Sequence, residues 1–535
     1  MSKAAEDGVG IRAGKMLYPI FIGQMSGVIL TALTFIVVAR ILGPSDYGVY
    51  TFAISFYALL NSFLAFGLGG YLGYAIPKKL YSKDHDGMLR AISSGYIISA
   101  GISGTFTLVG IALSGYVSGA FSHIGVTPDM LMIASATVVV YIISSMPSNI
   151  LIGLSRSGLA STLGVTIQVM QLILSIFLTI HYGAIGAVAA IFIGCVIGLV
   201  PGVYLVYISI SRYCKPRILL PSVKEIVETL RFAWPMGIAN FMNNGMNNFA
   251  VIFLGLFVTP FVLGNYGAAS KMFSLLALIY GTFGISLLPI FQAVKELKPK
   301  REVNGTYHKI MNFELIAMLP LMIFAGVLAV PFIYLFVGGG YTIAPLYFVL
   351  IAVGATIGLF GNYVNYLLIS EEHTLSIAKV NFISLIVQLA LVIVLVPYTK
   401  AIGMIVIIFF IGNVLEAILF AKETRNLFRL TFSKRKILLL YASSLVFGLV
   451  IGALYLVTDH FLGGPMVFRY MAEIALCLCA SLAVYPVILI ALRAVTESDL
   501  KDMRLATSKL GMISKIFSGF FDYSDWVWRA IAGRG

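Results

Sequence analysis

The stretch VVARILGPSDYGVYTFA, residues 37–53, joins two apolar runs through a short polar turn. The first run ends at Arg40, Gly43-Pro44 supplies the turn, and an aromatic-rich run begins after Asp46. Ser45 or Asp46 is placed to cap the second run, because the first amides of a helix lack partners within it. The stretch therefore predicts two apolar helices that meet at a tight turn, with one arginine beside the turn.

The composition of the whole chain places such helices in a bilayer. Of 535 residues, 60% are hydrophobic and only 11% are charged, whereas a soluble domain is about 25% charged. A membrane span needs about 20 mainly apolar residues and must be helical, because lipid offers no partners to bare amides. Fourteen stretches qualify: 16–39, 48–71, 91–113, 130–151, 159–180, 184–208, 232–258, 264–291, 310–336, 346–369, 375–396, 401–421, 437–457 and 471–492.

The cations divide between the two sides of these stretches very unevenly. Arg40, Lys400 and Arg469 fall in the loops of one side, and Lys271 lies inside a stretch. The other 32 of the 36 lysines and arginines flank the opposite ends or lie in the two terminal segments. Since cations mark cytoplasmic ends, we expect a multi-pass protein of the cell membrane with both termini in the cytoplasm. The same distribution accounts for the net charge of +14 without nucleic acid as a partner.

Two long segments of the chain resemble each other. MQLILSIFLTIHYGAIGAVAAIFIG (170–194) is similar to VQLALVIVLVPYTKAIGMIVIIFFIG (387–412). Such similarity indicates two copies of a six-helix unit, and an even number of spans gives both copies the same orientation. Four landmarks share a spacing of 217 or 219 positions: Gln171 with Gln388, Ala184-Ile185-Gly186 with Ala401-Ile402-Gly403, Tyr47-Gly48 with Tyr266-Gly267, and Arg90 with Lys309.

The predicted fold is thus an all-α polytopic membrane protein of about 14 transmembrane helices. Residues 1–215 form an N-lobe of helices 1–6, and residues 216–430 form a C-lobe of helices 7–12. Residues 431–493 add helices 13 and 14, and residues 494–535 form a cytoplasmic amphipathic tail. Parallel repeats of this kind pack as two lobes with the substrate site between them.

The opening stretch also resembles a known family. A first helix that ends in A-R-x-L-G-P, followed by a tyrosine-glycine pair, is similar to the polysaccharide-export branch, which includes the O-antigen flippases, of the multidrug/oligosaccharidyl-lipid/polysaccharide flippase superfamily. The resemblance implies a flippase that moves a polyprenyl-(pyro)phosphate-linked oligosaccharide from the cytoplasmic to the outer leaflet, for cell-surface polysaccharide or glycoprotein assembly. It also implies alternating access, no cofactor, membrane lipids around the protein, and glycan-assembly enzymes as further partners. By similarity, Arg40 becomes a candidate for phosphate contact; the alternative is an arginine that snorkels to the outer surface.

Polar residues inside the predicted spans supply the other site candidates. Lys271 is expected at about the depth of Arg40, where the two cations could hold a pyrophosphate, or it snorkels outward. In a regular helix the asparagines of ANFMNNGMNNF share an arc of about 140°, either as a cavity wall for sugar hydroxyls or a cation, or as interhelical hydrogen-bond partners. These asparagines are Asn240, Asn243, Asn244, Asn247 and Asn248.

The acids and the remaining amides inside the predicted spans are expected to have structural roles. We expect Glu314 to be hydrated near the cytoplasmic end of its helix, and Glu416 to pair with a nearby arginine or lysine rather than to couple an ion. Glu473 is a third buried acid. Four amides are expected to serve in packing, with an extension of the polar cavity lining as the alternative: Gln168, Gln171, Asn362 and Asn365.

Three alternative functions follow from the same pattern. A multidrug/cation antiporter would need a carboxylate for its coupling ion, and the N-terminal spans contain none. A lipid II-type flippase differs from the first hypothesis only in its glycan. An enzyme is not expected, because glycan-assembly enzymes generally carry a sizeable outer loop with catalytic groups, and the outer loops here are short. The four cysteines and six histidines form no metal or redox motif.

Overall fold

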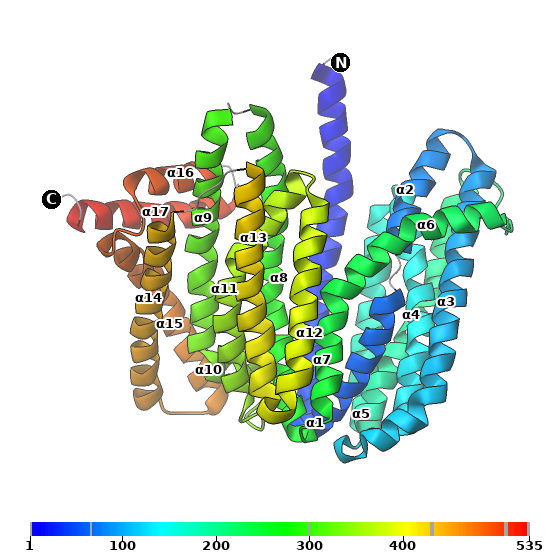
Figure 1. The fold of residues 1–535 in the computed structure, drawn as a ribbon, viewed down its shortest axis with the longest axis horizontal. Helices are drawn as coiled ribbons and strands as arrows, with labels where there is room; N and C mark the ends of the chain where they lie inside the picture. Colours follow the sequence, from blue (N-terminus) through cyan, green and yellow to red (C-terminus); the bar gives the residue numbers. More distant parts are fainter. Residues whose placement is uncertain (1–2, 65–66, 298–299, 429–432, 508–511, 532–535) are drawn as a thin grey trace. The chain divides into compact units, whose positions relative to one another are not determined.

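The computed structural model describes residues 3–64, 67–297, 300–428, 433–507 and 512–531. Every regular element in these ranges is helical (Figure 1), which confirms the predicted all-α class. The elements are α1 (Lys3–Leu64), α2 (Leu68–Tyr81), α3 (His85–Ala120), η1 (Ser122–Ile124), α4 (Pro128–Gly153), α5 (Ser157–Ser211), α6 (Val223–Asn240), η2 (Phe241–Gly245), α7 (Met246–Gly255), α8 (Pro260–Leu297), α9 (Lys300–Val327), α10 (Ala329–Phe336), α11 (Ala344–Ser370), α12 (Thr374–Ile405), η3 (Val406–Gly412), α13 (Asn413–Phe428), α14 (Lys434–Phe461), α15 (Met466–Ala491), α16 (Glu497–Thr507) and α17 (Met512–Ile531).

Within the described ranges, ten helices are long and apolar enough to cross a membrane. The longest, α5, has 55 residues, which would make a straight helix about 80 Å long against a hydrocarbon core of about 30 Å. It reverses instead at Gly183, where φ is 60° and ψ is −139°. A Cβ on Gly194 would lie 2.4 Å from Gln171, and one on Gly198 would lie 2.5 Å from Ile167, so the two arms pack antiparallel as a helical hairpin.

Two more of the ten helices are hairpins of the same kind. In α1 the backbone leaves the helical region at Gly43 (φ 68°, ψ 175°), and the rings of Phe35 and Tyr47 come within 6.0 Å, although twelve residues of straight helix would separate them by about 18 Å. In α12 the reversal is at Lys400 (φ 53°, ψ −138°). Three hairpins among ten helices make thirteen crossings, and the continuous rod of α6, η2 and α7 contains the remaining predicted span. All fourteen predicted stretches thus have a helical counterpart, thirteen of them within the ten long apolar helices.

The α5 and α12 hairpins share more than their sequence similarity. Their reversal points, Gly183 and Lys400, are 217 positions apart and have nearly the same dihedral angles. The second arm of the α12 hairpin, counted from Lys400 to Gly412, is one residue longer than the arm from Gly183 to Gly194 in the α5 hairpin. The longer arm contains the π-helix η3. A π-turn accommodates one extra residue, so a Cβ on Gly412 would still meet Gln388, at 2.5 Å, as Gly194 meets Gln171.

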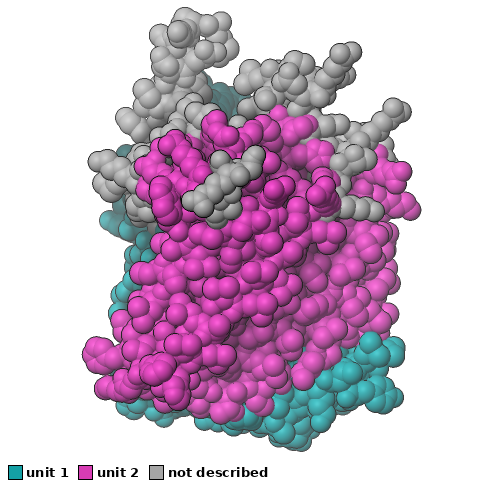
Figure 2. Space-filling model, turned by 90° about the vertical axis from the view of Figure 1, so that its left-hand side faces the viewer, with its two compact units in different colours: residues 1–268, 392–401 teal, residues 269–391, 402–535 magenta. Residues whose placement is uncertain are grey.

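The described chain divides into two compact units, coloured separately in Figure 2. Unit 1 comprises residues 1–268 and 392–401, and its main core lies among α2, α3, α4 and α5 around Leu72, Ile76 and Ile150. Unit 2 comprises residues 269–391 and 402–535, and its core joins α9, α11, α14 and α15. The lobe boundaries at 215 and 430 stay a prediction.

The C-terminal segment folds onto unit 2. Figure 1 shows α17 lying across the direction of α14. The Tyr523 hydroxyl donates to the Ala483 carbonyl of α15 at 3.1 Å, and Val527 is buried in the core of the unit. Arg504 of α16 forms ion pairs with Asp522 and Asp525 of α17. Part of the apolar side of the tail therefore contacts protein; Leu510 and the side chains of Ile513, Ile516 and Phe517 lie outside the described residues.

Candidate functional site

Arg40 lies in α1, three residues before the reversal at Gly43. Its neighbours Val38 and Ala39 are buried, whereas Arg40 itself is exposed. This placement puts the cation beside the tip of the first hairpin. An exposed side chain at the hairpin tip is compatible both with a phosphate contact and with an interface anchor.

The hairpin tip packs closely against the first turns of α8, and both parts belong to unit 1. A Cβ on Gly48 would lie 1.9 Å from the Pro260 carbonyl oxygen, and one on Gly264 would lie 1.8 Å from the Pro44 carbonyl oxygen. The contact is therefore reciprocal, and both the proline pair and the glycine pair are 216 positions apart. Only glycine allows the two backbones to come this close.

Lys271 lies in α8, seven residues beyond Gly264, and its side chain is exposed. At 1.5 Å per residue it is about 10 Å along the helix from the glycine contact. Arg40 belongs to unit 1 and Lys271 to unit 2. Their joint binding of one phosphate group stays a prediction.

The asparagine-rich segment is not a regular α-helix. Asn240 ends α6, Asn243 and Asn244 lie in the π-helix η2, and Asn247 lies in α7. The expected 140° arc assumed 100° per residue throughout, and this premise is wrong across η2 because a π-turn contains more residues. Asn247 is exposed, and the side chains of Asn240, Asn243 and Asn244 lie outside the described residues.

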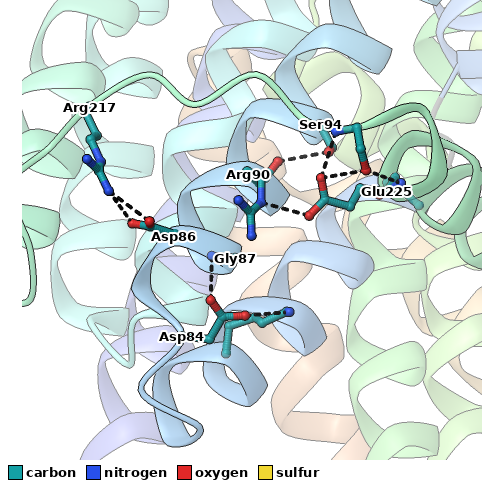
Figure 3. Close-up of polar contacts among 10 residues, drawn as sticks. Asp84, Asp86, Gly87, Arg90, Ser94, Arg217 and Glu225 are labelled. Carbon is teal, nitrogen blue, oxygen red and sulfur yellow. Dashed lines mark hydrogen bonds and ion pairs between the residues drawn. The ribbon is translucent and has the colours of Figure 1, made fainter.

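A polar network fastens the start of α6 to α3, and sequence reasoning missed it (Figure 3). Arg90 Nε donates to Glu225 Oε1 at 2.9 Å, and Glu225 also accepts from the Ser222 amide at 2.8 Å. The linker that precedes α6 is attached as well, since Arg217 donates to both carboxylate oxygens of Asp86 at 2.7 and 2.9 Å. The hydrogen bonds from Ser222, followed by Arg90, hold the pKa of the Glu225 carboxyl below its usual value. The signal was present in the sequence, because Ser222-x-x-Glu225 is a capping box.

Glu416 is bound by neutral groups, so the expected pairing with arginine or lysine is wrong. The Ser384 hydroxyl donates to Glu416 Oε1 at 2.9 Å, and Gln388 Nε2 donates to Ser384 Oγ at 2.7 Å. The matching positions of the α5 hairpin are Ile167 and Gly198, which pack directly together. The second hairpin therefore carries a polar chain where the first has an apolar contact.

The other two buried acids differ from each other. Glu473 is fully buried and its Oε1 accepts from Arg469 Nε at 2.9 Å, one helical turn away. Arg469 also pairs with Asp459, so one arginine is shared by two acids, and Glu473 Oε2 is buried without a hydrogen-bond partner. Glu314 is only 1% exposed, and neither of its oxygens has a hydrogen-bond partner. The expectation that Glu314 is hydrated is therefore wrong in this conformation.

The amides behave as packing groups where their contacts are defined. Gln171 Nε2 donates to Cys195 Sγ at 3.5 Å and packs on Gly194. Gln168 packs on Gly27 of α1, and its Oε1 is buried without a partner. Among the described residues, no group of three or more histidines, cysteines or acids is arranged to hold a metal ion.

Comparison with known proteins places this architecture in a family. Residues 15–295, just over half of the chain, match the family described as polysaccharide biosynthesis protein. The chain belongs to the polysaccharide biosynthesis protein family. The predicted resemblance to polysaccharide-export flippases is thereby confirmed at the level of the family. No curated protein sequence matches the chain.

Solved structures support the same fold for this family member. A lipid II flippase, MurJ, in an inward closed conformation has 16% sequence identity and a TM-score of 0.66, over 88% of this chain and 98% of the other. An inward-facing multidrug resistance MATE family transporter of the MOP superfamily has 15% identity and a TM-score of 0.61, over 75% and 94%. A MATE structure in the bent conformation has 16% identity and a TM-score of 0.53, over 79% and 97%. The chain is thus a multi-pass membrane protein with the fold of MOP-superfamily transporters and flippases.

Proposed function

We propose that this protein is a flippase that moves a polyprenyl-(pyro)phosphate-linked oligosaccharide from the cytoplasmic to the outer leaflet by alternating access. The observation that carries the proposal is the match to the polysaccharide biosynthesis family over residues 15–295. The likeness in fold to a lipid II flippase supports it. The product would serve cell-surface polysaccharide or glycoprotein assembly, and the glycan-assembly enzymes would be its partners.

The proposed substrate has two parts that need different contacts. Its diphosphate is anionic and is costly to move through hydrocarbon without cations along the path. Arg40 and Lys271, both exposed, are the proposed phosphate contacts. Its sugars offer hydroxyl groups, for which the amides of Asn240, Asn243, Asn244 and Asn247 are the proposed partners. The protein would act as a transporter without catalysis, in a cell membrane and with both termini in the cytoplasm.

The direct test is a comparison of leaflets. Lipid-linked glycans would be quantified in the outer leaflet of cells with and without this protein, using an impermeant glycan-modifying reagent. We expect glycan to accumulate in the inner leaflet when the protein is absent. An unchanged distribution between the leaflets would contradict the proposal. The same assay in proteoliposomes that contain lipid II would separate a lipid II-type flippase from a flippase for another glycan.

A multidrug/cation antiporter is the second candidate. The polar chain from Gln388 through Ser384 to Glu416 favours it, because a carboxylate inside the membrane can hold a coupling ion, and the fold is similar to that of a MATE transporter. Efflux of a cationic dye from cells distinguishes the two functions. A dye gradient that depends on Glu416, with no change in glycan distribution, would favour the antiporter.

A further inference from the structure

Glu314 is an ionisable group in the interior of a membrane helix. It lies in α9, nine residues into the span Gly305–Val327, or about 13 Å along the helix axis. The side chain is 1% exposed, and both carboxylate oxygens lack a hydrogen-bond partner. No described lysine, arginine or histidine forms an ion pair with it.

The surroundings of Glu314 are apolar. Met311 and Met318 lie one helical turn before and after it on the same face of α9, and both belong to the core of unit 2, as does Leu315. The helix α9 packs against α11 and α14. The acid is therefore directed into the packed interior of the unit and away from its surface.

The titratable neighbours are tyrosines, and none of them donates to Glu314. Tyr363 and Tyr366, both on α11, are the described groups that interact with it electrostatically. The elements around α9 direct their tyrosine hydroxyls to backbone carbonyls: Tyr363 to Tyr307 at 2.6 Å, Tyr366 to Gly281 at 3.4 Å, Tyr441 of α14 to Thr356 at 2.6 Å, and Tyr485 of α15 to Ile316 at 3.0 Å.

The fold itself does not require an acid here. Arg90 and Lys309 are matching positions of the two repeats, so Gly95 in α3 corresponds to Glu314 in α9. Gly95 makes an ordinary packing contact, since a Cβ there would lie 3.4 Å from Leu72. The carboxyl group is thus an addition of the second repeat to a helix that folds without one in the first.

An ionised carboxylate cannot remain in such a place without a partner, whereas the neutral acid can. We propose that Glu314 is a proton-binding site: it holds a proton while α9 is packed as in this structure and releases it when a second conformation admits water. The acid O–H bond breaks, the proton passes to water, and the carboxylate becomes hydrated. The release of this proton couples one proton to each exposure of the site during transport. This part of the inference rests on the proposed flippase function.

The first test needs no substrate. Infrared spectra of the full-length protein in lipid vesicles would be recorded at neutral pH for the native chain and for Glu314→Gln. We expect the difference spectrum to show the carbonyl band of one protonated carboxyl group, and the subtraction of Glu416→Gln to leave that band in place. A difference spectrum without it would overturn the proposal. Glu314→Leu, which is also neutral, repeats the test if the glutamine variant does not fold.

The second test concerns coupling. In proteoliposomes, native transport is expected to fall about tenfold for each pH unit on the alkaline side of the titration, because the proton-bound fraction falls in that proportion. Transport by Glu314→Gln should not vary with pH over the same range. A native pH profile that survives in Glu314→Gln would overturn the coupling. If the protein moved no glycan at all, the flippase function would fail while the infrared band would still establish the proton site.

Discussion

At the scale of single residues, the two exposed cations Arg40 and Lys271 carry the proposed chemistry. Their side chains differ in kind, because a guanidinium offers a planar fork of donors and an ammonium is a compact point charge. Arg40 suits bidentate contact with a phosphate group. Lys271 would add charge without fixing the geometry.

We therefore expect Arg40→Gln or Lys271→Gln to reduce flipping at least tenfold, since each variant removes one of the proposed compensating charges. Arg40→Lys should retain part of the activity, because the charge remains and the fork is lost. Appearance of lipid-linked glycan in the outer leaflet of proteoliposomes measures all three. Lys400→Gln, which removes another cation predicted for the same side, is the matched control. Near-normal flipping by both glutamine variants would leave Arg40 as an interface anchor.

Glu225 offers a prediction about pH. Its pKa is lowered in the folded state, so its contribution to stability is present above the unfolded-state pKa of about 4.3 and is lost as the pH falls through the lower folded-state value. Glu225→Gln should cost on the order of 1 kcal/mol at pH 7, given a partly exposed ion pair and a helix cap. Thermal unfolding of both proteins should converge at acidic pH. Glu228→Gln, an exposed acid on the same helix, is the control, and an equal loss there would argue against the network.

The sequence is least informative about the surroundings of single residues. It shows that Glu314 and Glu416 are acids in apolar helices, but the groups around them lie largely on other helices, and the pattern of one helix does not identify its neighbours. Glu314 lies near the start of the predicted stretch 310–336, which favours hydration, but the apolar part of α9 begins at Gly305 and the side chain is buried in the core of unit 2. The capping box at Ser222 is the opposite case, since it is local and could have been read directly.

At the scale of elements, the two matched hairpins explain what the π-helix η3 does. It absorbs the single residue by which the second copy is longer, and it keeps Gly412 in register with Gln388. The reversal points could be located from glycine and proline signals at Gly43, whereas the reversal at Lys400 occurs at a non-glycine residue with positive φ. The sequence still indicates that turn, because Lys400 falls in the loop between the predicted spans 375–396 and 401–421.

Deletion of Phe410 tests this account of η3. The shortened segment VIIFIG would match AAIFIG of the first hairpin, so we expect an α-helical arm and a change in unfolding temperature of only a few degrees. Deletion of Leu419 in α13 is the control, because it rotates every later residue of that helix by about 100° and should prevent folding. The measurement is thermal stability in detergent by size-exclusion chromatography. Equal damage from both deletions would be incompatible with a bulge that accommodates one residue.

The reciprocal glycine contact makes a second prediction for elements. Gly48→Ala or Gly264→Ala would place a methyl group within 2 Å of a backbone oxygen, an overlap that costs about 1–3 kcal/mol even after adjustment. We expect a lower unfolding temperature for each variant. Gly101→Ala in α3, where a Cβ meets nothing within 4 Å, should not lower the unfolding temperature, because alanine favours a helix more than glycine does. Native stability in the Gly48 and Gly264 variants would mean that the helices separate without cost.

At the scale of the whole molecule, the apolar runs predicted the all-α membrane fold, and the cation distribution predicts the orientation of the chain in the bilayer. This orientation determines the energetics as well, because a membrane potential that is negative inside drives an anion outward. Two uncompensated charges gain about 4.6 kcal/mol per 100 mV, so the potential alone could bias export.

Orientation can be measured with single cysteines in a chain whose native thiols have been replaced. We expect a cysteine within residues 292–309 to be protected from an impermeant thiol reagent in intact cells, and a cysteine within residues 338–341 to react. The reason is the clustering of cations in the first segment and their absence from the second. Permeabilised cells, in which both should react, provide the control. Labelling of the first segment in intact cells would reverse the proposed topology.

The contact between Pro44-to-Gly48 and Pro260-to-Gly264 has a consequence for ancestry. Each proline carbonyl meets a glycine of the other copy, but these pairs are 216 positions apart, whereas the neighbouring landmarks Tyr47-Gly48 and Tyr266-Gly267 are 219 apart. The contact therefore joins positions that are offset from the equivalence of the repeats by three residues, about one helical turn. If one half-length gene was duplicated and fused, a symmetric homodimer of its product would not have made the contact in its present register, and the contact arose after the two copies had begun to differ.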